Sequence, residues 1–348
     1  TFTKGKTVPH VMEILMNFFL PNVGELNFEQ KAYFVGYMVF NLLMVFTKNQ
    51  KPTDRDSFKY KRVEVPGTLL YDLFKEYYTL QQRNIYLKID KEYYYHVDQY
   101  QKNFVSLIEN NYREFFKERI VETGIRKGFK GDWGSEAHTK KPGVVQDLNR
   151  LSFNSAISHL RKINLPLEAS AKIVKPHLLH NSQWGIIDPV DTPDGGNVGL
   201  HKHMAIATQI TNNCSGVPMI NWMRINTGMK LLEECSTKYI SQCTKIFVNG
   251  SWVGVLDNPQ FVMKKIKFFR HLALLPVYLS CHWNMTTNDI FIYTDAGRLT
   301  RPIFYMNGEN PSYAPFEKII KDRDFTWNEL ITGFLKKEDQ RFQVDGCK

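Results

Sequence analysis

The stretch KIFVNGSWVGVL, residues 245–256, carries the strongest local indication of structure in the chain. Two short runs with β-branched residues flank Asn249-Gly250, a pair that suits a two-residue turn because both positions then need a positive φ. These residues predict a β-hairpin. A helix-like segment over 258–275 follows, and DIFIYTD at 289–295 predicts a further strand. From about residue 205 the chain is therefore expected to be rich in β-structure.

The part of the chain before this region has mostly helical patterning. Helices are predicted over 9–46, with a break at Pro21–Gly24, and over 67–120 and 143–162, whereas 51–62 and the glycine-rich 124–134 are expected to be loops. The fold class expected is α+β, with a helical N-terminal part and a β-rich C-terminal part. Ala32–Thr47 is uncharged but shorter than the roughly 20 residues of a membrane span. It is interpreted as a buried core helix, and no membrane segment is expected.

Composition limits the class of protein and of partner. The 348 residues include 45 basic and 35 acidic side chains, a net charge of +10, with 43% hydrophobic and 23% charged residues. These values exclude a mainly disordered chain, suggest about two domains, and favour an acidic partner such as nucleic acid, an anionic membrane or an acidic protein. Five cysteines without a CxxC pair argue against a zinc ribbon or a disulfide framework and for an intracellular setting. The first residues lack an initiator methionine, so we expect a piece of a longer protein.

Unusual chemistry gathers in residues 126–203. This window holds eleven Lys and Arg against seven acids, and six of the ten histidines. A metal site could use His177, His180, His201 and His203 with Asp191 or Asp194, but the spacing matches no closed motif and loop histidines more often bond to the backbone.

Phosphate contact is a second interpretation of the same window. Arg150 and Arg161 would share a face if they lay on one continuous helix, and Lys175 before Pro176 should have an extended backbone. A merely solvated basic surface fits equally well. Hydrolysis by Asp188, Asp191 and Asp194 is a third interpretation, but a tight turn over 192–195 explains that spacing better.

A family resemblance covers these residues. The segments LNRLSFNSAISHLRKINLP (148–166) and AKIVKPHLLHNSQWGIIDPVDTPDGGNVGLHKHMA (171–205) resemble the second-largest, β-like subunit of multisubunit DNA-directed RNA polymerases. The eukaryotic, archaeal and large-DNA-virus branch is the most similar. Supporting matches in the same order include TDRDSFKYKRVEVPGTLL (53–70), FVNGSWVGV (247–255) and TDAGRLTRPIF (294–304).

The resemblance implies a division of the chain and a set of site residues. Residues 1–50 would end the lobe, 51–130 belong to the protrusion, 131–213 form the fork that lines the active centre, and 214–348 form the external region. The resemblance implies nucleic-acid or active-centre contacts for eight residues: Gln146, Arg150, Lys175, His177, His180, Asn181, Asp191 and Asp194. The argument that Arg150 and Arg161 would share a helix face adds Arg161 to this set. The chain departs from the family where His177-Leu178 replaces Arg-Gln, where Asp191 and Asp194 replace two Glu, and where the fork loop reads LEASAK (167–172).

The resemblance also implies what other parts of the enzyme supply. The acids near the second magnesium, the hybrid-binding lysines and the zinc cysteines would lie further C-terminal, and the catalytic aspartates in the largest subunit. This piece is therefore expected to have no catalytic residue, bind no metal and be inactive alone. The complete enzyme would use Mg²⁺, structural Zn²⁺, NTPs, a DNA template, nascent RNA, the largest subunit and other subunits.

Alternatives remain at this point. A diverged, non-catalytic assembly or scaffold subunit would also fit the His177-Leu178 change, and a free-standing metal hydrolase is more remote. The 24 Phe and 17 Tyr, with frequent Lys, Asn and Ile, suggest an AT-rich genome, such as that of a large DNA virus or a protist. The expected location is then the nucleus, or a viral factory or virion.

Overall fold

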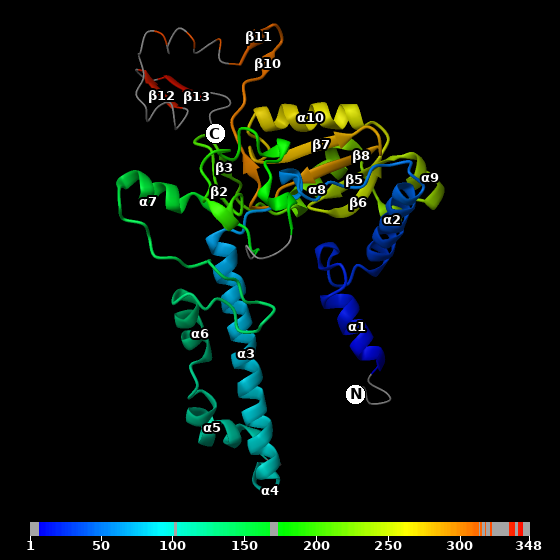
Figure 1. Cartoon of the computed structure of the whole chain (residues 1–348). Helices are drawn as coiled ribbons and strands as arrows, with labels where there is room; N and C mark the ends of the chain where they lie inside the picture. Colours follow the sequence, from blue (N-terminus) through cyan, green and yellow to red (C-terminus); the bar gives the residue numbers. More distant parts are fainter. Residues whose placement is uncertain are drawn as a thin grey trace. The chain divides into compact units, whose positions relative to one another are not determined.

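The computed structural model describes residues 7–100, 103–167, 173–312, 314, 317, 321, 334–337 and 340–343. The chain forms two compact units (Figure 1), and each is discontinuous in sequence. Unit 1 comprises residues 1–55, 60–62 and 207–348, and unit 2 comprises 56–59 and 63–206. In the described part of the chain, no helix has the length and apolar character needed to cross a membrane. The four-region division inferred from the family resemblance stays a prediction.

Unit 1 is built on a five-stranded sheet with the order β4-β6-β5-β8-β7. The sheet strands are β4 (Lys230–Leu231), β5 (Thr244–Val248), β6 (Ser251–Leu256), β7 (Ser280–Asn284) and β8 (Asp289–Tyr293). β5 pairs with β8 in parallel, and the other pairs are antiparallel. The hairpin prediction is confirmed: Asn249 and Gly250 join β5 to β6 with φ values of 50° and 85°.

Helices and smaller strands complete unit 1. The helices are α1 (Thr7–Asn17), α2 (Phe28–Phe46), α8 (Val217–Thr227), α9 (Thr237–Gln242) and α10 (Pro259–His271), with 3₁₀ turns η1 (Pro21–Val23) and η6 (Leu232–Glu234). Short antiparallel pairs are formed by β3 (Gln209–Ile210) with β9 (Leu299–Thr300), β10 (Met306–Asn307) with β11 (Asn310–Pro311), and β12 (Phe334–Lys337) with β13 (Gln340–Gln343). The predicted break at residues 21–24 and the predicted helix after Asn258 are both present.

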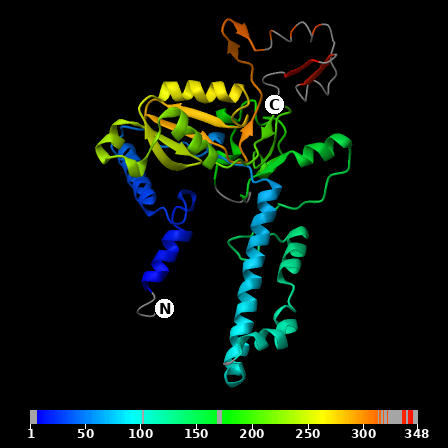
Figure 2. The same cartoon turned by 180° about the vertical axis from the view of Figure 1, so that it is seen from behind.

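Alternation along the strands divides the core of unit 1 between the two sheet faces. Ile246 and Val248 of β5 pack with Val262 and Ile266 of α10, which runs along one face of the sheet (Figures 1 and 2). Phe247, the residue between them, instead packs with Trp252 and with aromatic residues of α2. This two-residue periodicity follows from the pleat, in which successive side chains point to opposite faces.

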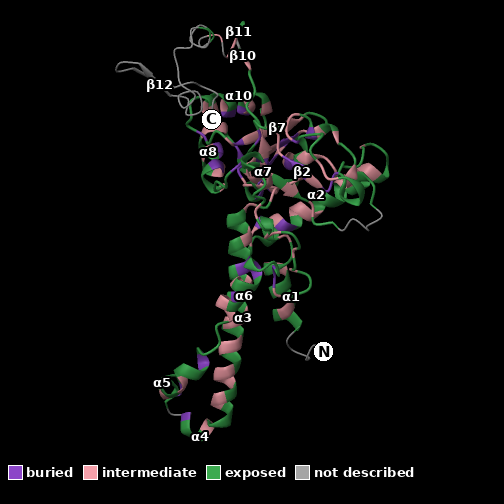
Figure 3. Cartoon of the chain, turned by 60° about the vertical axis from the view of Figure 1, so that its left-hand side comes forward, coloured by how far each residue is buried: buried purple, intermediate pink, exposed green. Residues whose placement is uncertain are grey.

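Unit 2 contains a long helix and a loop-rich region. Its helices are α3 (Pro66–Tyr95), α4 (Val97–Tyr100), α5 (Phe104–Phe115), α6 (Ile120–Phe129) and α7 (Phe153–Leu160). The remaining elements are β1 (Lys162–Asn164), β2 (His201–His203) and the 3₁₀ turns η3 (Lys175–His177), η4 (Asn181–Gln183) and η5 (Gly195–Asn197). The residues of η2 (Phe58–Tyr60) are divided in sequence between unit 2 and unit 1. One cluster of buried residues in unit 2 lies where α3 and α6 run side by side (Figure 3), and a second is formed by Tyr100, Leu107 and Phe115 of α4 and α5.

The loop predicted over 124–134 is wrong for its first half, which forms the last turns of α6. Gly124 and Gly128 are four residues apart, so they lie on one face of the helix. That face packs on α3, where a Cβ at Gly124 would overlap the ring of Tyr77 and one at Gly128 would come within 2.8 Å of Leu73 Cδ2. The glycines therefore permit close helix packing, and only Gly131 and Gly134 have the positive φ of a loop.

The helix predicted over 143–162 is also mostly wrong, because the structure forms only α7, from Phe153 to Leu160. Gly143 has a φ of +74°, outside the helical region. Ser152 acts as the N-cap: its hydroxyl accepts a hydrogen bond from Ser155 N, and the Ser155 side chain accepts from Ser152 N. A capping box of this kind starts a helix at the next residue.

The interpretation of residues 32–47 as a buried core helix is wrong in part. The segment is helical as α2, and Tyr33, Phe34 and Tyr37 pack against the sheet core. The other face is accessible to solvent, and Leu42 is 68% and Phe46 82% exposed.

Candidate functional site

The residues singled out in the sequence window lie in the loop-rich part of unit 2, where α7 forms one side. The N-cap of α7 is supported by Asn149, whose Oδ1 accepts hydrogen bonds from Leu151 N and Ser155 Oγ, at 3.0 and 3.1 Å. His159, near the other end of the helix, lies with Nδ1 3.1 Å from Asn149 N and Nε2 2.8 Å from Gln146 Oε1. The predicted residue Gln146 therefore helps to hold the segment before α7 against His159 of that helix.

The antiparallel pair β1–β2 brings two distant parts of the window together. Lys162 is opposite His203, and Asn164 is opposite His201. The pairing continues through the bridge between Ile187 and Met204. Residues 162–164 are thereby held against residues 201–203, which follow the PVDTPDGG sequence at 189–196.

A small polar hollow of about 180 Å³ lies between α7 and this strand pair. Two of its lining residues are histidines and one is a lysine. The lining comprises Asn149, Ser155, Ser158, His159, Lys162, Asp191 and His203. Of the predicted site residues, only Asp191 lines the hollow, and Gln146 is one hydrogen bond away from it through His159.

His203 is the most buried titratable group of the hollow. Its Nδ1 lies 3.1 Å from Asp191 Oδ2 and 2.9 Å from Ser158 Oγ. Burial lowers the pKa of His203 below its usual 6.5, and Lys162 adds to this effect while Asp191 opposes it. Serine and aspartate both approach the same ring nitrogen, whereas a serine nucleophile needs the opposite nitrogen of a histidine that the acid orients. The arrangement therefore does not fit a hydrolytic triad.

A second set of contacts holds the KPH turn of η3. His177 Nδ1 lies 2.6 Å from Val198 O, and Lys202 Nζ donates to Pro176 O at 3.4 Å. Gly199 has a φ of +74°, and a Cβ there would lie 2.9 Å from the carbonyl carbon of His177. Lys175 begins this 3₁₀ turn, so the extended backbone predicted before Pro176 is wrong. The proline at the second position of the turn suits its geometry.

The remaining predicted residues have local roles in the surrounding turns. His180 caps η4, its Nδ1 accepting from Ser182 N at 3.1 Å, and Asn181 is the exposed first residue of that turn. Asp194 precedes η5 without a side-chain cap bond. Asp188 Oδ1 accepts from the amides of Val190 and Asp191, which is an Asx turn. This Asx turn lies at residues 188–191, before the tight turn predicted over 192–195, where the structure has a bend at Asp194 followed by η5.

The three predicted cations differ in how they are held. Arg161 donates from Nη2 to Ala205 O at 2.7 Å, so its guanidinium ties unit 2 together internally. Arg150 lies before α7 and not on it, so Arg150 and Arg161 share no helix face. The Lys175 side chain is 78% exposed, and its Nζ lies 4.0 Å from Asp56 Oδ2. Arg150 is exposed, and no described residue forms a hydrogen bond or ion pair with it.

Several residues of the hollow were missed by the sequence interpretation, namely Asn149, Ser155, Ser158 and Lys162. A usable signal was the Ser152-x-x-Ser155 spacing, which resembles a capping box and would have moved the helix start. No comparable signal marks Lys162, because its place follows from pairing with His203, 41 positions later. The fork-loop segment LEASAK lies outside the described residues except for Leu167.

The metal interpretation finds no support in the described part of the chain, which contains no group of three or more His, Cys, Asp or Glu side chains able to hold an ion. His177 faces a carbonyl, His180 caps a turn and His203 pairs with Asp191. Asp191 and Asp188 are likewise engaged. These donors are therefore already engaged within the protein.

Comparison with known proteins identifies the family. Residues 146–210 match the family model described as RNA polymerase Rpb2, domain 3, and residues 246–307 match RNA polymerase Rpb2, domain 4. The first match contains the polar hollow, and the second contains most of the five-stranded sheet.

Similar full-length proteins agree with these matches. The chain is 33% identical over 344 residues to the DNA-directed RNA polymerase II subunit RPB2 of Encephalitozoon cuniculi, covering 95% of this chain and 29% of that protein. It is 33% identical to RNA polymerase II subunit 2 of Arabidopsis thaliana, covering 97% of this chain and 28% of that protein. With subunit 2 of the Acanthamoeba polyphaga mimivirus polymerase the identity is 29%, over 92% of this chain and 27% of the viral protein.

The chain belongs to the family of second-largest subunits of DNA-directed RNA polymerases. It spans less than a third of the length of the curated relatives it matches. The resemblance inferred from LHNSQWG, PVDTPDG and NVGL is therefore confirmed, as is the α+β fold class.

Proposed function

We propose that this chain lines the active centre of a DNA-directed RNA polymerase that makes RNA from NTPs on a DNA template. The supporting observation is that the family-matched residues 146–210 contain both the polar hollow, with Lys162 in its lining, and the exposed cations Arg150 and Lys175. Templated nucleotidyl transfer depends mainly on positioning and charge stabilisation, so a supporting subunit contributes basic groups and rigid loops.

The cations divide by role in this proposal. Arg150 and Lys175 are exposed and are proposed to contact the sugar–phosphate backbone of template DNA or nascent RNA. Lys162 lines the hollow and is proposed to contribute further positive charge there. Arg161 is already bonded to the backbone of Ala205, so we assign it to positioning of the loop. Gln146, His177, His180, Asn181, Asp191 and Asp194 complete the proposed lining.

The catalytic magnesium is proposed to be held by other parts of the enzyme. Two described carboxylates of this region have protein partners: Asp191 pairs with His203, and Asp188 caps a turn. We further propose partnership with the largest subunit and the other polymerase subunits, an intracellular location, and no synthesis by this chain alone.

Replacement of Arg150 by Ala in the assembled polymerase tests the proposal. Loss of a backbone contact should slow elongation and reduce its sensitivity to salt. Lys264→Ala, at an exposed lysine of α10 in unit 1, is the matched control. Unchanged elongation and unchanged salt sensitivity in Arg150→Ala and Lys175→Ala would refute the assigned contacts.

A diverged, non-catalytic assembly subunit is the second candidate. It is favoured by His177, which stands where family members commonly have arginine and whose Nδ1 faces Val198 O. Reconstitution with a largest subunit distinguishes the two candidates, because assembly without templated RNA synthesis would favour the scaffold.

A further inference from the structure

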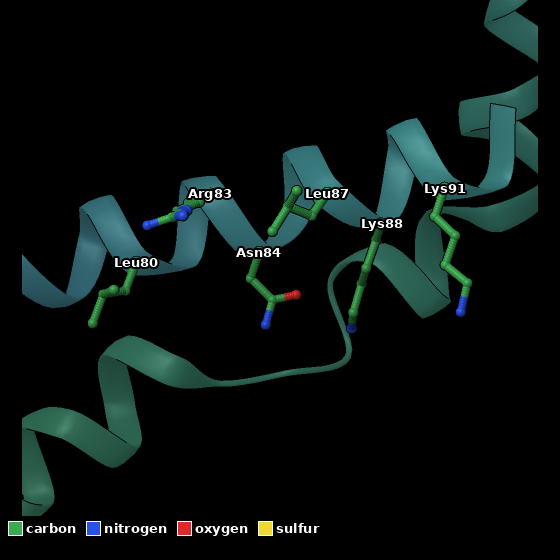
Figure 4. A pocket seen from close by; sticks show the side chains of 6 residues that line it. All are labelled: Leu80, Arg83, Asn84, Leu87, Lys88 and Lys91. Carbon is green, nitrogen blue, oxygen red and sulfur yellow. The ribbon is translucent and has the colours of Figure 1, made fainter. Parts of the chain in front are cut away.

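A groove on α3 is lined by residues that precede those of the polar hollow in the chain. It has a volume of about 420 Å³, and its lining combines two leucines, one amide and three cations. Figure 4 shows these side chains: Leu80, Arg83, Asn84, Leu87, Lys88 and Lys91.

The sequence spacing places these residues on two adjacent ridges of the helix. Leu80, Asn84 and Lys88 follow each other at intervals of four residues, as do Arg83, Leu87 and Lys91. Residues four apart are neighbours on one face of a helix. In Figure 4 the first ridge points toward the connection between α5 and α6. All six side chains that line the groove come from α3.

We call Leu80, Asn84 and Lys88 the inner ridge. The positive charge of Lys88 on this ridge is neutralised by the connection between α5 and α6. Glu118 lies with Oε1 2.9 Å from Lys88 Nζ, and Asn84 Nδ2 donates to Glu118 Oε2. These two partners lower the pKa of Glu118, so its carboxylate is ionised at neutral pH. Lys88 therefore has its counter-charge within the protein.

Arg83, Leu87 and Lys91 form the outer ridge, and its two positive charges have no such acidic partner in the described part of the chain. Arg83 and Lys91 are exposed, and no described residue forms a hydrogen bond or ion pair with either. Leu87 lies between them with 54% of its surface exposed. With Glu118 counted, the groove keeps two uncompensated positive charges on either side of an apolar side chain.

We infer that this groove docks an acidic amphipathic segment of a separate protein, with an apolar residue over Leu80 and Leu87 and carboxylates toward Arg83 and Lys91. The stretch from Leu80 to Lys91 is about 17 Å long at 1.5 Å per residue, which accommodates about three turns of a bound helix. Helix-in-groove recognition uses apolar anchors at this spacing. The six lining residues include no aromatic ring, whereas single-stranded nucleic acids are bound largely by stacking on aromatic side chains.

The test measures binding of a fluorescein-labelled synthetic helix of about sixteen residues, roughly matched to the groove length, with leucines along one face and glutamates beside them. Its anisotropy is followed with the 348-residue chain and with the variants Arg83→Gln/Lys91→Gln and Leu87→Ser. The matched control is Lys127→Gln/Lys130→Gln, which removes the same charge from exposed lysines of unit 2 that do not line the groove.

We expect the wild-type chain and the control to bind the peptide equally. The double charge variant should bind about fivefold more weakly, since two exposed ion pairs contribute modestly. Leu87→Ser should lose a similar factor, from the apolar area no longer buried. A peptide with glutamine in place of glutamate should bind as weakly to the wild-type chain as the acidic peptide binds to the charge variant.

Equal peptide affinity for all variants would overturn the inference, as would an equal loss in the control, because either result denies a specific groove. Displacement of the peptide by single-stranded RNA that itself depends on Arg83 and Lys91 would also overturn it, in favour of a phosphate surface. Every variant residue is exposed, and circular dichroism of each variant should overlay on that of the wild-type chain.

Discussion

The five-stranded sheet of unit 1 and the loop region 173–206 of unit 2 are stabilised by different kinds of contact. In the sheet, Ile246, Ile290 and Ile292 are fully buried in one apolar cluster, which they share with side chains of α8 and α10. In the loop region, Trp184 is 73% and Val190 82% exposed, and the turns are held by side-chain-to-backbone hydrogen bonds such as that of Thr192. The sheet depends on apolar burial, whereas the proposed nucleic-acid surface depends on a small number of specific polar contacts and on glycine conformations.

The largest expected effect is on the sheet. Ile246→Ala removes a fully buried side chain and should cost about 3 kcal/mol in the free energy of unfolding, because a cavity remains. Leu151→Ala, at a residue that is 91% exposed in unit 2, should be neutral within error. Urea denaturation of both variants measures the difference. Equal losses at the two positions would contradict the contrast in burial.

Gly199→Ala tests how the loop region is held. The left-handed φ and the contact with the His177 carbonyl should together cost about 2 to 3 kcal/mol. Gly195 has nearly the same φ, +73°, but open space around its missing Cβ, so Gly195→Ala should cost only about 1 kcal/mol. Thermal unfolding of the two variants isolates the backbone contact, and indistinguishable melting temperatures would refute it.

Tyr37→Phe tests the polar contact that joins α2 to the sheet. Tyr37 OH donates to the buried Asp289 Oδ2 at 2.9 Å, and loss of this donor should cost about 1 to 2 kcal/mol.

The same contact has a predictable pH dependence. Burial and the charge of Asp289 raise the pKa of Tyr37 above its usual 10.0. The folded state therefore holds this proton more tightly than the unfolded state, and the resulting stability is lost as pH rises above about 10. Alkaline unfolding curves should converge for wild type and Tyr37→Phe, and a constant difference across this range would contradict the contact.

The smallest effect is expected at the polar hollow. The pKa of His203 is lowered mainly by burial, so the unfolded state takes up its proton first as pH falls. The stabilising contribution is present above pH 6.5 and is lost as pH falls through the folded pKa. His203→Gln should flatten this acid dependence by less than about 1 kcal/mol. An unchanged pH profile of unfolding between pH 5 and 7.5 would show that His203 does not titrate in this way.

Local patterns predicted those parts of the fold whose causes are local. The Asn249-Gly250 turn, the strand at 289–293 and the Asn258-capped helix α10 all follow from neighbouring residues. The parallel pairing of β5 with β8 and the packing of α2 on the sheet could not be predicted in this way. Tyr37 and Asp289 are 252 residues apart, and nothing in either local sequence indicates the contact.

The site was predicted at the level of its region but not of its geometry. The family resemblance rested on residues 148–166 and 171–205, which lie inside the family-matched 146–210, yet the helix was placed too early and Lys162 was missed. The reason is that the loop backbone is fixed by single side chains, such as Ser152, Thr192 and Asp188, acting on specific amides. Gly124 and Gly128 led to the incorrect prediction of a loop, because they allow close packing of α6 on α3 and do not form a turn.

The most direct test of the central claim is the salt dependence of binding between this chain and an RNA–DNA hybrid. If Arg150 and Lys175 contact backbone phosphates, Arg150→Ala/Lys175→Ala should weaken binding. It should also reduce the slope of log affinity against log salt by about two, or roughly one per lost contact. The Lys264→Ala control should keep the wild-type slope within error. An unchanged slope in the double variant would contradict the proposal that this region of unit 2 is a nucleic-acid surface.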